Sequence, residues 1–352
     1  MPKPGAKRNK SRGVIAVLAL ALILSALGSL FVGASGMTLR EGFAALFGNG
    51  TAAQSRILWS IRIPRILAAL AAGAGLSVAG LIMQTVLSNP MASPSTLGVS
   101  NAAVFGANLS IIVFAGGFLT TGNNLANYAS AANPFAAGSM AFLFSAASVL
   151  LILGLCRLRS FAPGVVVLAG LALGAVWTAA TTVLQFYSTD VGLSAAVIWS
   201  FGDLSRATYR VDIILLAVTL LGTVFFRLLA WRYNALLSGE ATARTMGIRV
   251  NALRFCSLLA ASLMTAVCVS YLGVIGFVGI ICPHVVKKLL GQDHRVTVSA
   301  SALCGSLLLV LADTLSRSIG SGAALPVGAI TSLLGAPFFL TIIFSKKEHG
   351  SC

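Results

Sequence analysis

The residues of this sequence that could do chemistry are few and lie far apart. The three histidines are His284, His294 and His349, and the sequence contains no HExxH motif, no GxSxG motif and no Walker A loop. Cys282 with His284 is the nearest approach to a reactive pair, and His284 is better explained as a polar residue at a membrane interface. The six cysteines form no CxxC pair and mostly lie in apolar runs, which favours packing roles over metal or disulfide roles. The sequence therefore predicts no catalytic residue, no metal site and no cofactor bound by this chain.

The acidic residues also argue against an ion-coupled mechanism. The sequence has only eight Asp and Glu residues, and none lies deep in an apolar run; Asp313 is near the end of its run. Secondary transporters that use ion gradients usually carry ionisable residues inside the membrane. The energy for transport should then come from a partner protein. An ion-coupled secondary transporter is the alternative, and a membrane-embedded enzyme is a weaker one.

The composition predicts the fold class. Hydrophobic residues make up 57% of the chain and charged residues 9%, whereas a soluble domain carries roughly 25% charged residues. Apolar runs of about 20 residues recur, and that length spans a bilayer as a helix. The net charge of +16 does not indicate nucleic-acid binding, because the basic residues form short clusters between the apolar runs. We expect an all-α, polytopic bundle of about ten transmembrane helices.

The predicted spans cover nearly the whole chain. They are residues 14–32, 66–87, 97–114, 138–155, 165–186, 213–230, 252–269, 274–290, 298–311 and 327–344. This gives an N-terminal tail at 1–13, one transmembrane domain at 14–345 and a C-terminal tail at 346–352. A cleaved signal peptide is the alternative for the first run, but the run is longer than a typical signal core, so a retained helix is favoured. The spans that start at 66 and 252 would run in opposite directions, and an inverted repeat is a hypothesis.

The basic residues predict the orientation. With the N-terminus inside, 17 of the 24 Lys and Arg residues fall on the cytoplasmic side, as the positive-inside rule requires. Those on the outer side are Arg40, Arg56, Arg62, Arg65, Arg206, Arg210 and Arg317. Both termini should therefore be cytoplasmic.

Polar segments between the spans suggest where partners bind. Arg62 and Arg65 flank Pro64 just before the second span; they could clamp carboxylates of an external partner or anchor lipid head groups. Residues 87–100 are uncharged and contain two prolines, which predicts either backbone that lines a cavity or an ordinary tight turn. Residues 237–248 predict a short helix with Ser238 as its cap and Gly247 at its end, either a docking element or an interfacial loop helix.

The last third of the chain contains further short motifs, which are G-V-I-G-F-V-G-I-I-C-P-H at 273–284, D-H-R at 293–295, A-D at 312–313 and L-P-V-G with G-A-P-F-F after it. Together with the segments above, these motifs resemble the iron-siderophore, haem and vitamin B12 permeases of the type II ABC importers. The resemblance covers residues 61–344. It implies a second permease chain, identical or paralogous, two ATP-binding subunits that use ATP and Mg, and an extracytoplasmic substrate-binding protein, in the plasma membrane of a prokaryote. The implied cargo is a chelated iron compound, a ferric siderophore first because such systems are the most numerous, with haem or cobalamin as alternatives.

The resemblance also assigns roles to residues. It implies binding-protein docking by Arg62, Arg65 and Arg317. The implied contacts to the ATPase are Gly239, Glu240, Ala243, Arg244, Met246 and Gly247. The implied translocation path and gate are Asn89, Pro90, Gly98, Ser100, Ala162 and Pro163. The stretch 161–164 lacks the hydroxyl residues that the vitamin B12 permease has at its inner exit, so the chemistry of this gate is left open.

Overall fold

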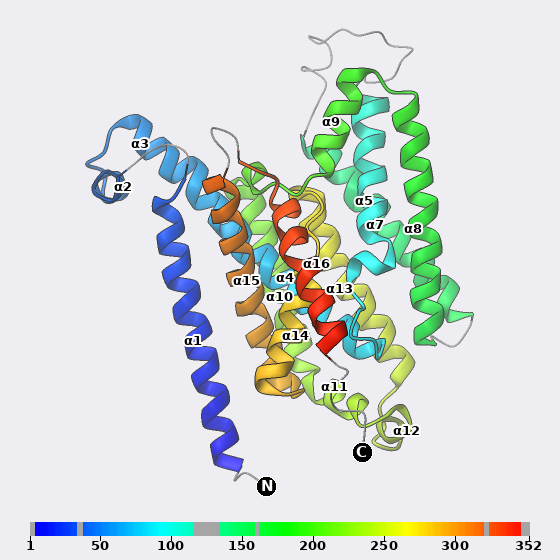
Figure 1. Cartoon of the computed structure of the whole chain (residues 1–352). Helices are drawn as coiled ribbons and strands as arrows, with labels where there is room; N and C mark the ends of the chain where they lie inside the picture. The colour runs from blue at the N-terminus through cyan, green and yellow to red at the C-terminus, as the bar shows by residue number, and fades with distance from the viewer. Residues whose placement is uncertain (1–3, 34–37, 116–133, 159–161, 320–323, 346–352) are drawn as a thin grey trace.

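The chain is a bundle of helices in the computed structural model, which describes residues 4–33, 38–115, 134–158, 162–319 and 324–345 (Figure 1). The helices are α1 (Pro4–Phe31), α2 (Leu39–Leu46), α3 (Ala52–Arg56), η1 (Ile57–Arg62), α4 (Ile63–Val86), η2 (Pro94–Leu97), α5 (Val99–Asn108), η3 (Leu109–Phe114), α7 (Pro134–Arg157), α8 (Pro163–Phe186), α9 (Asp190–Ser200), η5 (Leu204–Arg206), α10 (Tyr209–Leu228), α11 (Ala230–Leu237), α12 (Glu240–Thr245), α13 (Val250–Leu272), α14 (Val278–Leu290), α15 (His294–Ile319) and α16 (Val327–Ser345).

The helices confirm the predicted fold class. Within the described part of the chain, seven helical segments are long and apolar enough to cross a membrane. The other three predicted spans correspond to the shorter α5–η3, α14 and α16. The predicted N-terminal tail is mostly part of α1, which begins at Pro4, and the C-terminal tail lies outside the described residues.

The structure differs from the prediction mainly in two segments. The second span does not begin at residue 66, because α3, η1 and α4 form one continuous helical run that starts at Ala52. The segment between the predicted spans 165–186 and 213–230 contains a further helix, α9. With 11 residues, α9 is too short to span a bilayer, and its apolar run was hidden between the polar residues on either side.

Helix α4 forms the centre of the bundle, and its side chains are almost all buried. Small residues let neighbouring backbones approach it closely, as is usual for helices packed in lipid. A Cβ atom on Gly80 would collide with the carbonyl of Gly279 on α14, and one on Gly73 would collide with the carbonyl of Gly305 on α15. The density of Gly and Ala in this span is therefore a packing requirement.

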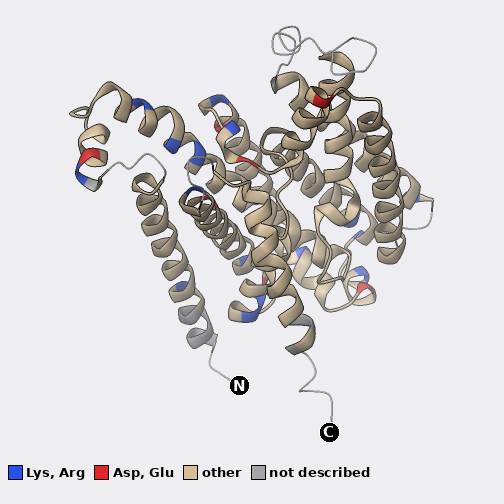
Figure 2. Ribbon diagram, turned by 45° about the horizontal axis from the view of Figure 1, so that its top comes forward, with Lys and Arg blue, Asp and Glu red and all other residues tan. Residues whose placement is uncertain are grey.

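The bundle has two ends that position the candidate sites. The α12 end contains α11, α12 and the start of α13; the α9 end contains α2, α3, α9 and η5 (Figure 1). Helix α13 begins beside the end of α4, since Arg254 Nε donates to the carbonyl of Val86 over 3.1 Å, and the two helices are antiparallel. Charged residues gather near the helix ends, and long stretches of the spans carry none (Figure 2).

Candidate functional site

A cavity at the α12 end brings together several of the predicted path and ATPase-contact residues. We call it the α12 cavity; its volume is about 780 Å³. Its lining includes Asn89, Pro90 and Pro163 from the predicted path, and Gly239 and Glu240 from the predicted ATPase contact. Residues that are distant in the sequence thus meet around one space, where the end of α4, the start of α8 and the start of α12 converge.

The connection between α4 and α5 forms one wall of the α12 cavity. After α4 the chain turns at Ser88, whose φ of 47° is unusual for a residue other than glycine. Asn89 then accepts a hydrogen bond from the amide of Met91 over 2.9 Å. Gly98 has a φ of 68°, and a Cβ atom there would lie 3.1 Å from both the carbonyl oxygen of Gly170 and the Cα of Gly174 on α8. The connection is therefore held tightly against α8.

The other predicted path residues lie beside this connection. Ser100 is buried in the first turn of α5, and Ala162 is the exposed residue that precedes α8. Neither lines the α12 cavity. Phe161, the first residue of the stretch that differs from the vitamin B12 permease, lies outside the described residues.

The predicted short helix exists as α12, although its cap is wrong in the prediction. Gly239, not Ser238, is the N-cap residue, and Ser238 ends α11. The φ of 111° at Gly239 is disfavoured for any residue with a Cβ atom, which explains why glycine occupies this position. Ala243 is fully buried, whereas Arg244 and Met246 are exposed. Helix α12 thus packs through one side and offers the other to a partner.

Glu240 connects α12 to the centre of the bundle. One carboxylate oxygen accepts from Arg244 over 2.7 Å and the other from Arg254 over 2.8 Å. The hydrogen bond from Arg244 lowers the pKa of Glu240 most, and Arg254 lowers it further against the opposing effect of burial. Because the buried Arg254 also donates to Val86, a contact chain runs from α12 through α13 to the last residue of α4.

Three further contacts join α4 to its neighbours at this end. The Lys287 ammonium on α14 donates to Gln84 Oε1 over 2.9 Å, and Gln84 donates to the carbonyl of Gly279 over 3.3 Å. Thr85 lies 2.8 Å from the buried ring of His294 on α15. Sequence reasoning did not single out Arg254, Lys287 or Gln84. A signal did exist, since Arg254 and Lys287 are cations placed close to the ends of apolar runs.

At the α9 end, the predicted docking arginines are buried. Arg65 Nε donates to Asp313 over 2.6 Å, and Arg317 Nε lies 3.0 Å from the other carboxylate oxygen of Asp313. Arg317 also bonds to the carbonyls of Ser29 and Val32 at the end of α1, and Arg62 bonds to Leu30 there. In this chain, then, the three arginines join α4 and α15 to α1 and do not form an exposed rim. Docking through them stays a prediction.

Asp313 lies in the last two turns of α15, and its side chain is only 1% exposed. Asp212 in the first turn of α10 is also buried, and neither of its oxygens has a hydrogen-bond partner among the described residues. Acidic residues do therefore enter the helical bundle. Both lie close to a helix end.

Comparison with known proteins decides the family. The family model described as the FecCD transport family matches residues 20–345. The chain belongs to the FecCD transport family. It is 42% identical over 334 residues to the ABC transporter permease protein MJ0087 of Methanocaldococcus jannaschii, with 95% of this chain and 94% of the relative covered.

Two other relatives and a solved structure agree. The chain is 33% identical to the hemin transport system permease protein HmuU of Yersinia pestis, with 98% and 99% of the two chains covered. It is 32% identical to the vitamin B12 import system permease protein BtuC of Vibrio cholerae, with 87% of each covered. A solved inward-facing conformation of a metal-chelate type ABC transporter superposes with a TM-score of 0.80 at 26% identity, over 95% of this chain and 99% of that one.

This FecCD-family chain is thus an integral membrane protein of the plasma membrane and a permease of the ABC transporter class. The comparisons do not favour an ion-coupled secondary transporter. A permease of this class works with ATP-binding and substrate-binding partners, so each end of the bundle is a candidate surface for one of them.

Proposed function

We propose that the chain is one permease subunit of an importer that moves a chelated iron compound into the cytoplasm, with a ferric siderophore as the first candidate and haem or cobalamin as alternatives. The names of the relatives, which include hemin, iron-hydroxamate and vitamin B12 permeases, support this substrate class. The complete importer would contain a second permease chain, two ATP-binding subunits that hydrolyse ATP, and an extracytoplasmic binding protein.

The observation that carries the proposal is the contact chain at the α12 end. The exposed side of α12 is available to an ATP-binding subunit, while its Glu240 contacts Arg254 and, through it, Val86. Val86 lies two residues before the Ser88–Pro90 wall of the α12 cavity. A displacement of α12 on ATP binding would thus reach the proposed gate through only two side chains. Packed helices respond to such a push by switching between discrete arrangements.

The same proposal orients the chain. The α12 end would face the cytoplasm, with both termini on that side and α1 retained as the first span. The α9 end, with α2, α3 and the cluster of Arg62, Arg65 and Arg317 (the arginine cluster), would face the binding protein. The positive-inside rule supports this direction, because most basic residues lie toward the α12 end of the spans.

The test is uptake into proteoliposomes that contain this chain, its ATP-binding subunit and its binding protein. Labelled ferric siderophores, haem and cobalamin would be offered separately, with ATP or a non-hydrolysable analogue inside. Uptake of one ligand that requires ATP hydrolysis would support the importer and identify its cargo. Uptake driven by an imposed ion gradient without ATP would refute the proposal in favour of a secondary transporter.

A further inference from the structure

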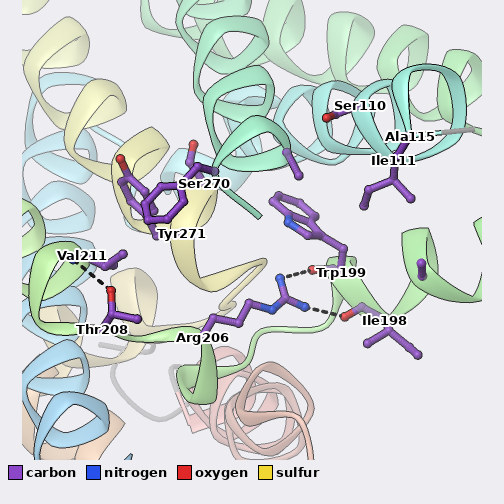
Figure 3. A pocket seen from close by; sticks show the side chains of 13 residues that line it. Ser110, Ile111, Ala115, Ile198, Trp199, Arg206, Thr208, Val211, Ser270 and Tyr271 are labelled. Carbon is purple, nitrogen blue, oxygen red and sulfur yellow. Dashed lines mark hydrogen bonds between the residues drawn. The ribbon is translucent and has the colours of Figure 1, made fainter. Parts of the chain in front are cut away.

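A second cavity lies at the α9 end, and the proposed transport mechanism does not use it. Its volume is about 570 Å³, and residues of η3, α7, α9, η5, α10 and α13 line it (Figure 3). Most of the lining residues are apolar. They include the rings of Phe135, Trp199 and Tyr271, and the small side chains of Ala137 and Ala195 leave the space open. Cavities of about 300–1,000 Å³ hold ligands of drug size.

Arg206 is the charged residue in the lining of this cavity. Its two terminal nitrogens donate to the carbonyls of Trp199, over 3.0 Å, and Ile198, over 2.8 Å, as the dashed lines in Figure 3 show. The guanidinium carbon lies 5.6 Å from the centre of the Trp199 ring. These contacts fix the cation at the edge of the cavity and use two of its five N–H donors.

Among the described residues, no carboxylate forms an ion pair with Arg206. The carboxylate of Asp203 affects Arg206 only through longer-range electrostatic attraction, and it accepts a hydrogen bond from the amide of Ser205 over 2.8 Å. A half-buried cation with unused donors is therefore available to an acidic ligand.

Exposed aromatic residues lie at the same end of the bundle as this cavity. Arg206 belongs to η5, between α9 and the long helix α10. At the same end, Trp59 and Tyr209 are exposed, and the Tyr209 hydroxyl donates to the carbonyl of Trp59. Exposed Trp and Tyr mark the membrane–water interface. An acyl chain could thus enter the apolar space while its head group stays beside Arg206.

We propose that this cavity binds an anionic lipid, with an acyl chain against the apolar wall and its acidic group beside Arg206. A metal chelate is a poorer match, because its polar groups would be desolvated against alanine, isoleucine and aromatic side chains without partners. A phospholipid phosphate and a fatty-acid carboxylate share the required chemistry. The inference does not depend on the transport function.

The experiment measures contact quenching of Trp199 in the full chain, reconstituted in phosphatidylcholine nanodiscs, after Trp59, Trp177 and Trp231 are replaced by Phe. Brominated phosphatidylglycerol, brominated phosphatidylcholine and a brominated fatty acid are titrated in at low mole fraction. We expect saturable quenching, with the anionic lipid bound about tenfold more tightly than phosphatidylcholine, the effect of one charge-assisted hydrogen bond. Stronger quenching by the fatty acid than by phosphatidylglycerol would identify the acidic group beside Arg206 as a carboxylate.

Variants separate the cavity from the lipid that surrounds every membrane protein. Arg206→Gln should remove the preference for anionic lipid, Arg206→Lys should keep it, and Arg210→Gln, at an exposed arginine outside the lining, should leave it unchanged. Ala137→Leu or Ala195→Leu should fill the space and weaken quenching by every lipid. Equal quenching by charged and neutral lipid, or full quenching in a Leu variant with an unchanged unfolding temperature, would overturn the proposal.

Discussion

Replacement of Glu240 by Ala should uncouple ATP hydrolysis from uptake. The change removes the carboxylate that accepts from the buried Arg254 over 2.8 Å, and with it the side-chain contact between α12 and α13 that leads to Val86. A hydrogen bond to a charged group contributes about 1.5–3 kcal/mol. Because the Glu240 side chain is 38% exposed, solvent screening reduces this to about 1–2 kcal/mol. That range corresponds to a factor of about 5–30.

The assay is the number of cargo molecules imported per ATP hydrolysed, in proteoliposomes that contain the complete importer. We expect the ratio to fall by about 5–30-fold in Glu240→Ala while ATP hydrolysis continues. Adding Glu240→Ala to Arg254→Ala should cause little further loss, since the two residues act through one contact. Glu41→Ala, which removes an exposed carboxylate from α2 at the opposite end, is the matched control. A ratio within about twofold of the wild type in Glu240→Ala, with the complex intact, would refute the role of this contact.

Three further predictions concern packing, burial of charge and pH. Gly80→Ala should lower the apparent unfolding temperature and the yield, since its Cβ atom meets a carbonyl of α14 and overpacking costs about 1–3 kcal/mol; Gly154→Ala, with open space around it, should not. Asp313→Asn should destabilise the chain by about 3–5 kcal/mol because it removes the buried carboxylate that Arg65 and Arg317 share. An unchanged unfolding curve would contradict the buried pairs. The pKa of Glu240 is lower in the folded chain than in the unfolded chain. The contribution of Glu240 to stability is therefore complete above its unfolded pKa of about 4.3 and is lost as the pH falls through its folded pKa. The wild type and Glu240→Gln should keep a constant difference in unfolding temperature at neutral pH and converge only in acid.

The positions of the spans could be predicted because each depends on a local property of the chain. An apolar run of sufficient length must form a helix in lipid, where every backbone polar group has to be paired internally. Residues 68–80 are rich in Gly and Ala, a composition typical of helices that pack inside a membrane bundle, and α4 is indeed buried. Helix α9 was missed because an 11-residue apolar helix gives no signal of this kind.

The contact chain at the α12 end could not be predicted from the same information. Glu240 and Arg254 are 14 residues apart, and Arg254 and Val86 are 168 residues apart. No periodicity links such positions, so only the packing of α13 against α4 brings them together. The resemblance to known permeases located α12 and implied that Glu240 contacts the ATPase, but it gave no reason to expect that Glu240 also contacts Arg254 on α13.

The resemblance and the structure give the arginine cluster different binding partners. The resemblance assigns Arg62, Arg65 and Arg317 to a partner's carboxylates, whereas in this chain all three are at most 9% exposed and Arg62 and Arg317 bond to carbonyls at the end of α1. A carboxylate can accept two parallel hydrogen bonds from one guanidinium group, whereas a single carbonyl cannot form such a bidentate pair. A docking protein could therefore compete for these two guanidinium groups only if the last turn of α1 gives up its carbonyl contacts. Under that mechanism, binding at the α9 end is coupled to the position of α1.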